Sequence, residues 1–192
     1  MTPLDLVVRI GSVLDDLGVE WVLGGSLASS IVGEPRSTLD IDLAVALQGS
    51  DVAPLMAAVR DDYYVSEEMV LEAVEHGSSF NLLHYETAIK IDVFVLTDDP
   101  LDQRQLSGRQ AVEVDAGHRV WIGSPIDQVL RKLRWFRSGG EVSDRQWRDV
   151  LAILTVQAHR IDRDELRAAA EQLGLGDLVT RAIAALEAPS EG

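Results

Sequence analysis

A short apolar segment that ends in two glycines constrains the fold of this chain more than any other feature. Val19 to Leu23 form the apolar run, Gly24 and Gly25 follow it, and residues 26–32 are small and largely apolar. This order predicts a strand that breaks into a tight turn and continues as a short helix. Glycines allow close backbone approach, and the free N–H groups of a helix start, together with the Ser26 hydroxyl, suit an anion. Such turns are common, so the turn alone does not establish a site.

The remaining chain alternates between helical and strand-like patterns up to residue 123 and is helical afterwards. Apolar spacing predicts helices over 3–17, 51–60 and 66–75, strands over 40–46, 111–114 and 119–122, and a hairpin formed by 80–85 and 89–96. Helices are expected from Ser124 to the Gly139-Gly140 pair and over 143–159, 162–173 and 177–187. We therefore expect an α/β core over 1–123 and a C-terminal helical subdomain over 124–192 that packs on it.

Charge and composition exclude several classes of function. The net charge of −15 argues against a broad nucleic-acid-binding surface, although residues 124–148 carry six basic and three acidic side chains. Without cysteine there is no disulfide, thiolate metal site or thiol nucleophile, and the four histidines lack the spacing of zinc ligands. No apolar run approaches the length of a membrane span, and the N-terminus lacks the pattern of a secretion signal. We expect a cytoplasmic protein with no membrane partner.

Three aspartates follow the glycine turn in an order that suits metal-assisted chemistry. Asp40 and Asp42 lie on one face of a strand, roughly 6.5–7 Å apart. Asp92 is the only acid in the apolar run Ile91–Leu96, where a buried carboxylate is costly without a cation. Hard carboxylate oxygens suit Mg²⁺, so we expect these three residues to be metal ligands and catalytic residues. A phosphate-binding turn beside them is what nucleotidyl or phosphoryl transfer requires.

These motifs resemble those of a known superfamily. The segment GGSLASSIVGEPRSTLDIDLAV is similar to the first motif of the polymerase-β-like nucleotidyltransferases, and KIDVF resembles their third-carboxylate strand. The thirteen residues between Ser26 and Asp40, with an Arg-x-(Ser/Thr) just before the acids, resemble the AbiEii-like branch more than the minimal MNT type. This resemblance implies a mixed β-sheet with flanking helices, NTP as substrate, and Mg²⁺ or Mn²⁺ as cofactor.

The resemblance also assigns roles to further residues. Gly24, Gly25 and Ser26 would hold the β- and γ-phosphates, and Asp92 would complete the site on the acceptor side. The branch carries a Lys and a downstream Asp on the helices after the sheet, and Lys132 and Asp149 occupy matching places. Arg36 is a further candidate for phosphate contact.

Each of these last three residues also has an ordinary interpretation. Lys132 could be a surface lysine with a packed stem, Asp149 could pair with Arg145 four residues earlier, and Arg36 could be structural. These alternatives stay open at this point.

The function expected from the sequence is transfer of a nucleoside monophosphate to an acceptor hydroxyl. The branch implies an RNA 3′ end, with tRNA among the options, or a protein side chain as acceptor, and it includes toxins of toxin–antitoxin systems. A cognate antitoxin or toxin protein is therefore an expected partner. Two alternatives remain: a catalytically degenerate nucleotide-binding or interaction module, and an MNT-type antitoxin that adenylylates a partner protein.

Overall fold

The fold is seen in a computed structural model that describes residues 1–31, 40–115 and 117–187. The chain divides into two compact units, Met1–Gly123 and Ser124–Gly192, which we call the N-terminal unit and the helical unit. None of the helices in the described ranges is long and apolar enough to cross a membrane.

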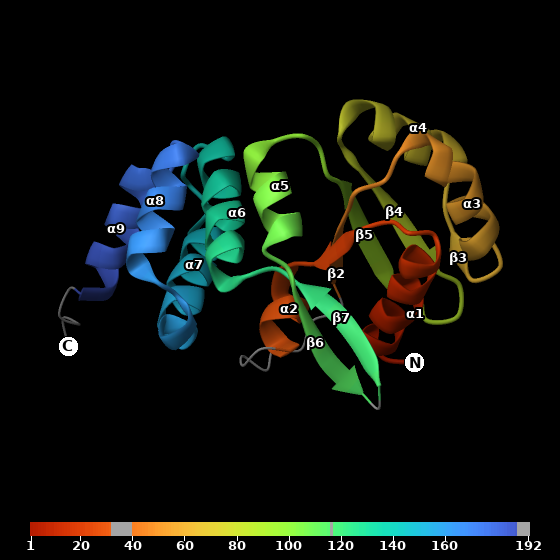
Figure 1. Cartoon of the computed structure of the whole chain (residues 1–192), viewed down its shortest axis with the longest axis horizontal. Helices are drawn as coiled ribbons and strands as arrows, with labels where there is room; N and C mark the ends of the chain where they lie inside the picture. The colour runs from red at the N-terminus through yellow and green to blue at the C-terminus, as the bar shows by residue number, and fades with distance from the viewer. Residues whose placement is uncertain (32–39, 116, 188–192) are drawn as a thin grey trace. The chain divides into compact units, whose positions relative to one another are not determined.

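A mixed seven-stranded sheet, in the order β3-β4-β5-β2-β1-β7-β6, forms the centre of the N-terminal unit (Figure 1). Its strands are β1 (Trp21–Leu23), β2 (Ile41–Val45), β3 (Tyr63–Tyr64), β4 (Ser79–His84), β5 (Lys90–Val95), β6 (Gln110–Asp115) and β7 (His118–Ile122). The pairs β2–β5 and β1–β7 are parallel, and the other neighbours are antiparallel. This sheet and its flanking helices confirm the α/β fold class with a mixed sheet.

The hydrophobic core of this unit lies between the sheet and helices on one of its faces. The helices of the unit are α1 (Pro3–Asp16), α2 (Gly25–Ile31), α3 (Gly49–Val59), α4 (Glu67–His76) and α5 (Pro100–Ser107). Alternate residues of β2 and β5, such as Leu43 and Val93, are buried in a cluster with Leu6, Ile10 and Leu55 of α1 and α3. The intervening residues of these two strands therefore lie on the opposite face of the sheet.

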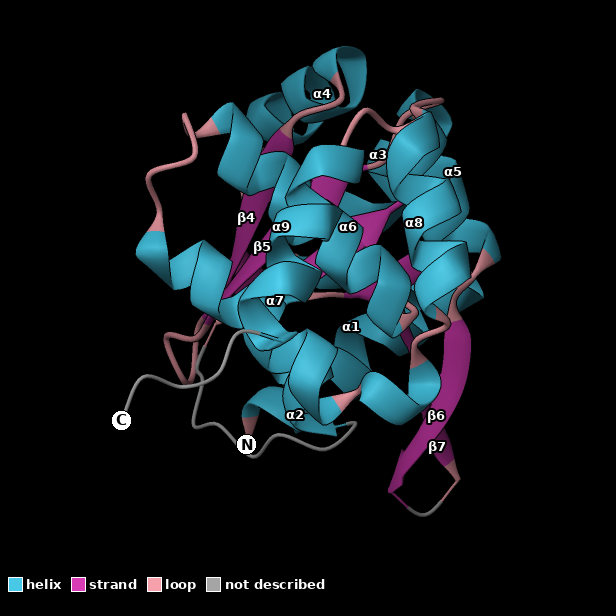
Figure 2. Ribbon diagram, turned by 90° about the vertical axis from the view of Figure 1, so that its left-hand side faces the viewer, coloured by secondary structure: helices cyan, strands magenta, loops and turns pink. Residues whose placement is uncertain are grey.

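The helical unit contains α6 (Pro125–Ser138), α7 (Asp144–Val156), a 3₁₀ turn (Ala158–Arg160), α8 (Arg163–Gln172) and α9 (Gly176–Glu187), and Figure 2 labels its α-helices. Ser124 caps α6 as the sequence predicts, since its hydroxyl accepts a hydrogen bond from the backbone N–H of Asp127 at 3.1 Å. The helices α6 and α7 pack against each other, and Leu130 and Leu133 of α6 and Val150 of α7 are buried.

Candidate active site

The glycine turn lies directly against Asp42. The N–H of Gly24 donates a hydrogen bond of 2.8 Å to the backbone carbonyl of Asp42. Gly25 has a φ of +63°, and a Cβ added to it would lie 1.9 Å from Oδ2 of Asp42. Only glycine both adopts this backbone conformation readily and lacks the Cβ that would clash with the Asp42 carboxylate. The turn after β1 and the first acidic strand therefore form one local structure, as their order in the sequence suggests.

Parallel pairing of β2 and β5 places Asp42 beside Asp92. Their Cα atoms are register partners, and adjacent strands lie about 4.8 Å apart. Both side chains are partly buried on the face opposite the core, where the side chain of Asp92 is 23% exposed. Asp40 directly precedes β2 and is exposed. The three carboxylates that the sequence singles out thus come from the same end of two neighbouring strands.

Among the residues that the structure describes, Lys90 contributes a cation to this carboxylate cluster, and the sequence-based assignment of site residues missed it. Its Nζ lies 2.8 Å from Oδ1 of Asp92. Its hydrogen bond with Asp92 raises the pKa of the Lys90 ammonium, and the charges of Asp92, Asp40 and Asp42 act in the same direction. A signal for it was present, because Lys90 is one of only two lysines and lies two residues before Asp92 on the same strand face.

The chemistry of these donors fits a hard divalent cation. Asp40, Asp42 and Asp92 supply the carboxylate oxygens that Mg²⁺ prefers, and the missing side chain of Gly25 leaves the space that the Asp42 carboxylate fills. In the conformation described, Asp92 is engaged by Lys90. Across the described ranges, no three His, Cys, Asp or Glu side chains converge in an arrangement that could hold a metal ion. These residues fit the ion by donor type, and Asp92 would have to exchange its partner to bind one.

Lys132 and Asp149 are brought together within the helical unit. Lys132 lies on α6 and Asp149 on α7, and Nζ is 2.9 Å from Oδ2. Their side chains are 15% and 16% exposed, so neither is the ordinary surface residue considered above. That Lys132 and Asp149 act together with the carboxylates of the N-terminal unit stays a prediction. Arg36 lies outside the described residues.

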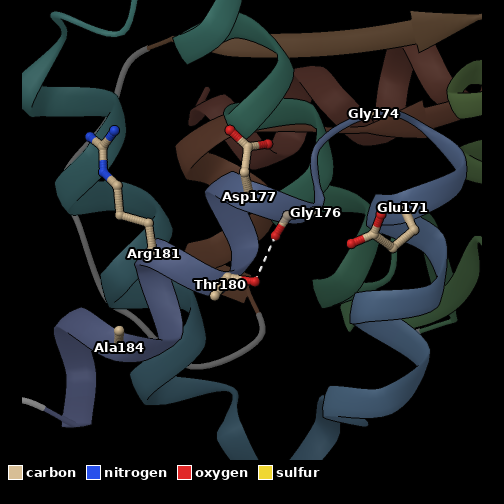
Figure 3. A pocket seen from close by; sticks show the side chains of 7 residues that line it. All are labelled: Glu171, Gly174, Gly176, Asp177, Thr180, Arg181 and Ala184. Atoms are coloured by element: carbon tan, nitrogen blue, oxygen red, sulfur yellow. Dashed lines mark hydrogen bonds between the residues drawn. The ribbon is translucent and has the colours of Figure 1, made fainter.

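A hollow of about 690 Å³ on the helical unit is a second place where a ligand site could be considered (Figure 3). It is lined by Glu171, Gly174, Gly176, Asp177, Thr180, Arg181 and Ala184.

Two charged groups at this hollow, Asp177 and Arg181, have structural partners. Asp177 accepts two hydrogen bonds from Arg137, at 2.6 and 2.7 Å, and this guanidinium lowers the pKa of the Asp177 carboxyl. Arg181 stacks 4.2 Å from the Trp147 ring centroid and lies 3.1 Å from Glu141. The Thr180 hydroxyl donates to the carbonyl of Gly176 at 2.9 Å, as the dashed line in Figure 3 shows. These contacts hold α9 against α6 and α7, and we assign the hollow no ligand.

Solved structures similar to this chain were found, whereas comparisons of its sequence found no match. No protein-family profile matches the chain, and no curated protein is similar to it in sequence. The solution structure of the antibiotic-resistance factor ANT(2'')-Ia is similar, with a TM-score of 0.57, 17% identity and 97% of each chain covered.

Two further structures have the same architecture. An antigenic nucleotidyltransferase-like protein from Paracoccidioides brasiliensis has a TM-score of 0.55 at 17% identity, with 93% of this chain and 90% of that chain covered. A crystal structure of ANT(2")-Ia in complex with adenylyl-2"-tobramycin has a TM-score of 0.50 at 18% identity, with 95% of each chain covered. The chain therefore has the fold of the nucleotidyltransferases.

Proposed function

We propose that this protein is a nucleotidyltransferase that moves a nucleoside monophosphate from an NTP to an acceptor hydroxyl. The observation that carries the proposal is the contact of the Gly24-Gly25 turn with Asp42, which is itself the register partner of Asp92. In a nucleotidyltransferase fold, this contact places a turn suited to phosphate beside paired carboxylates.

The proposed reaction is an in-line displacement at the α-phosphorus. The acceptor oxygen bonds to the α-phosphorus, the bond from that phosphorus to the bridging oxygen breaks, and pyrophosphate leaves. Asp92 takes the proton of the acceptor hydroxyl, while Ser26 and the backbone of Gly24 and Gly25 hold the β- and γ-phosphates. Asp40, Asp42 and Asp92 would hold Mg²⁺, which when bound would supply neutralisation of the triphosphate charge.

Lys132 is proposed to steady the leaving pyrophosphate, with Asp149 positioning its ammonium. The 2.9 Å ion pair supports this role, since it restricts an otherwise flexible side chain to one direction. Negative charge on the leaving group develops in the transition state and is smaller in the ground state, so a lysine placed there accelerates the chemical step more than it tightens binding.

The acceptor divides the proposal into two candidates. The first is an RNA 3′ end or a protein hydroxyl, in a toxin of the AbiEii-like type, and it rests on the sequence motifs and their spacing. The second is the hydroxyl of a cationic small molecule. It is favoured by the similarity to a structure holding adenylyl-2"-tobramycin over 95% of both chains, and by the net charge of −15, which attracts cations.

Transfer of label identifies both the activity and the acceptor. NTPs radiolabelled at the α-phosphate are incubated with the protein, Mg²⁺ and, in separate reactions, tRNA, a purified candidate partner protein, or an aminoglycoside. We expect label to enter one acceptor class with wild-type protein and none with Asp42→Asn. Binding of NTP and Mg²⁺ without transfer to any acceptor would instead support the degenerate nucleotide-binding module, and labelling of a co-encoded toxin would support the antitoxin alternative.

A further inference from the structure

Both lysines of this chain are paired with aspartates, but their surroundings differ. Lys132 pairs with Asp149 between two helices, where both side chains are about 15% exposed. Lys90 pairs with Asp92 at the start of a strand, and its side chain is 51% exposed. The charges of Asp40 and Asp42 also act on the Lys90 ammonium. Lys90 is therefore an accessible cation that faces three carboxylates.

The strand register explains why Lys90 reaches this cluster. Ile41 and Ile91 are partners in the parallel β2–β5 pair, so Lys90 and Asp40 occupy the preceding row of the sheet. Lys90 and Asp92 are two residues apart on β5, and residues at this spacing share a face. The ammonium thus lies on the same face as Asp42 and Asp92, at the end of the strands where the acids are found.

We infer that Lys90 is a positioning residue that holds the Asp92 carboxylate in the metal-free protein and releases it when a divalent cation binds. The inference rests on the proposed function, because it takes Asp92 as a ligand of that cation. Three neighbouring carboxylates repel one another, and a built-in ammonium offsets this repulsion. A lysine serves this purpose because its charge is compact and its stem is flexible, so that it can move away without rearranging the strand.

This role sets the metal affinity of the site. A divalent ion that uses Asp92 must break the 2.8 Å ion pair and also tolerate the positive charge of Lys90 nearby. Removing that charge should tighten metal binding and destabilise the metal-free protein. A single exposed ion pair contributes little, but Lys90 faces two further carboxylates as well as Asp92. We expect the affinity for Mn²⁺ to rise about three- to tenfold at low salt.

The test is Mn²⁺ binding to the full chain without nucleotide, measured as free Mn²⁺ by electron paramagnetic resonance. Lys90→Met removes the charge and keeps most of the stem, and Lys90→Arg keeps the charge. Arg9→Met is the matched control, since it breaks another ion pair of the N-terminal unit, that between Arg9 and Asp62. Circular dichroism confirms that each variant is folded.

We expect tighter Mn²⁺ binding and a lower metal-free melting temperature for Lys90→Met, and near wild-type affinity for Lys90→Arg and Arg9→Met. Equal or weaker binding by folded Lys90→Met would overturn the inference and leave the metal site in place. If neither wild type nor Lys90→Met bound Mn²⁺, the proposed metal-dependent function would fail together with the inference. The two failures are thus distinguishable.

Discussion

Replacing Gly25 by alanine should damage the site more than any other change of one methyl group. An L-residue at a φ of +63° costs about 1–2 kcal/mol. The new Cβ would lie 1.9 Å from Oδ2, 2.9 Å from Cγ and 3.2 Å from Cβ of Asp42. Rotating the carboxylate relieves the first two contacts at a cost of about 0.5–1.5 kcal/mol for an unfavourable rotamer. We expect Gly25→Ala to lower the free energy of unfolding by about 1.5–3.5 kcal/mol in total.

Gly18→Ala separates the backbone cost from the steric cost. Gly18 has a similar φ of +70°, but a Cβ there would meet nothing within 4 Å. The gain that alanine brings by restricting the unfolded chain is common to both variants and cancels in their difference. Gly18→Ala should therefore cost about 1–2 kcal/mol, and the excess at Gly25 should be about 1 kcal/mol. Adding Asp42→Ala to Gly25→Ala should recover most of that excess.

Urea unfolding and protection by nucleotide are the two measurements. Each kcal/mol shifts the melting temperature of a chain of this size by about 2–4 °C, so thermal melting also resolves the difference. Gly25→Ala should lose stabilisation by NTP and Mg²⁺, because Asp42 is displaced, whereas Gly18→Ala should keep it. Equal losses of stability in the two variants, with nucleotide protection retained at Gly25→Ala, would refute the reasoning.

Four further expectations follow from the described contacts. Mg²⁺ or Mn²⁺ should raise the melting temperature, and Asp40→Asn/Asp42→Asn should abolish that rise without unfolding the protein; an undiminished rise would exclude the metal assignment. With Mg²⁺ present, NTP should protect against thermal unfolding far better than NMP, whereas equal protection would mean that the glycine turn is only structural. Lys132→Met should slow transfer by about 10²-fold and destabilise the helical unit by about 1–3 kcal/mol. Adding Asp149→Leu should restore the stability but not the activity. Normal transfer rates in Lys132→Met would remove Lys132 from the site. Burial raises the pKa of Tyr63 to about 12, so the protonated form is favoured in the folded state and stability should fall as pH rises from about 10 towards 12. In urea unfolding, Tyr63→Phe should lose this alkaline dependence of stability. An unchanged pH profile in Tyr63→Phe would contradict the role of Tyr63.

Local signals account for most of the fold that the sequence predicts. The Ser124-Pro125 cap, the stop at Gly139 and the alternation around Asp42 all appear in the structure where the sequence places them. Each depends on neighbouring residues alone, so tertiary contacts were not needed to infer it. Helix α5 was missed because its residues are largely polar, although Asp99 caps it and Pro100 is its first residue. Strand β3 is two residues long, too short for any alternation to be visible.

Sequence patterns could not predict the ion pairs between residues that are distant along the chain. The interpretation of Asp149 as a partner of Arg145 considered only residues on one helix. In the structure, the partners of Asp149 include Lys132, which is seventeen residues away. The neighbourhood of Lys90 likewise depends on the register between β5 and β2, which no local spacing specifies. The carboxylates were identified because their positions in the strands are informative, and Lys132 was identified through the family resemblance. Lys90 and the partners of both lysines were not predicted, because those partners are set by tertiary structure.

The parallel pairing of β2 with β5 has a consequence for when the carboxylate cluster can form during folding. Asp42 and Asp92 are fifty residues apart, and β5 lies between β4 and β2 in the sheet. The β4–β5 hairpin can form locally, but closing β5 onto β2 is a non-local step and is therefore slow. During synthesis the chain cannot carry a complete site until β5 has emerged from the ribosome and paired on both edges. A chain that ended between these strands would keep Asp40 and Asp42 but could not form the carboxylate cluster, because Asp92 would be missing.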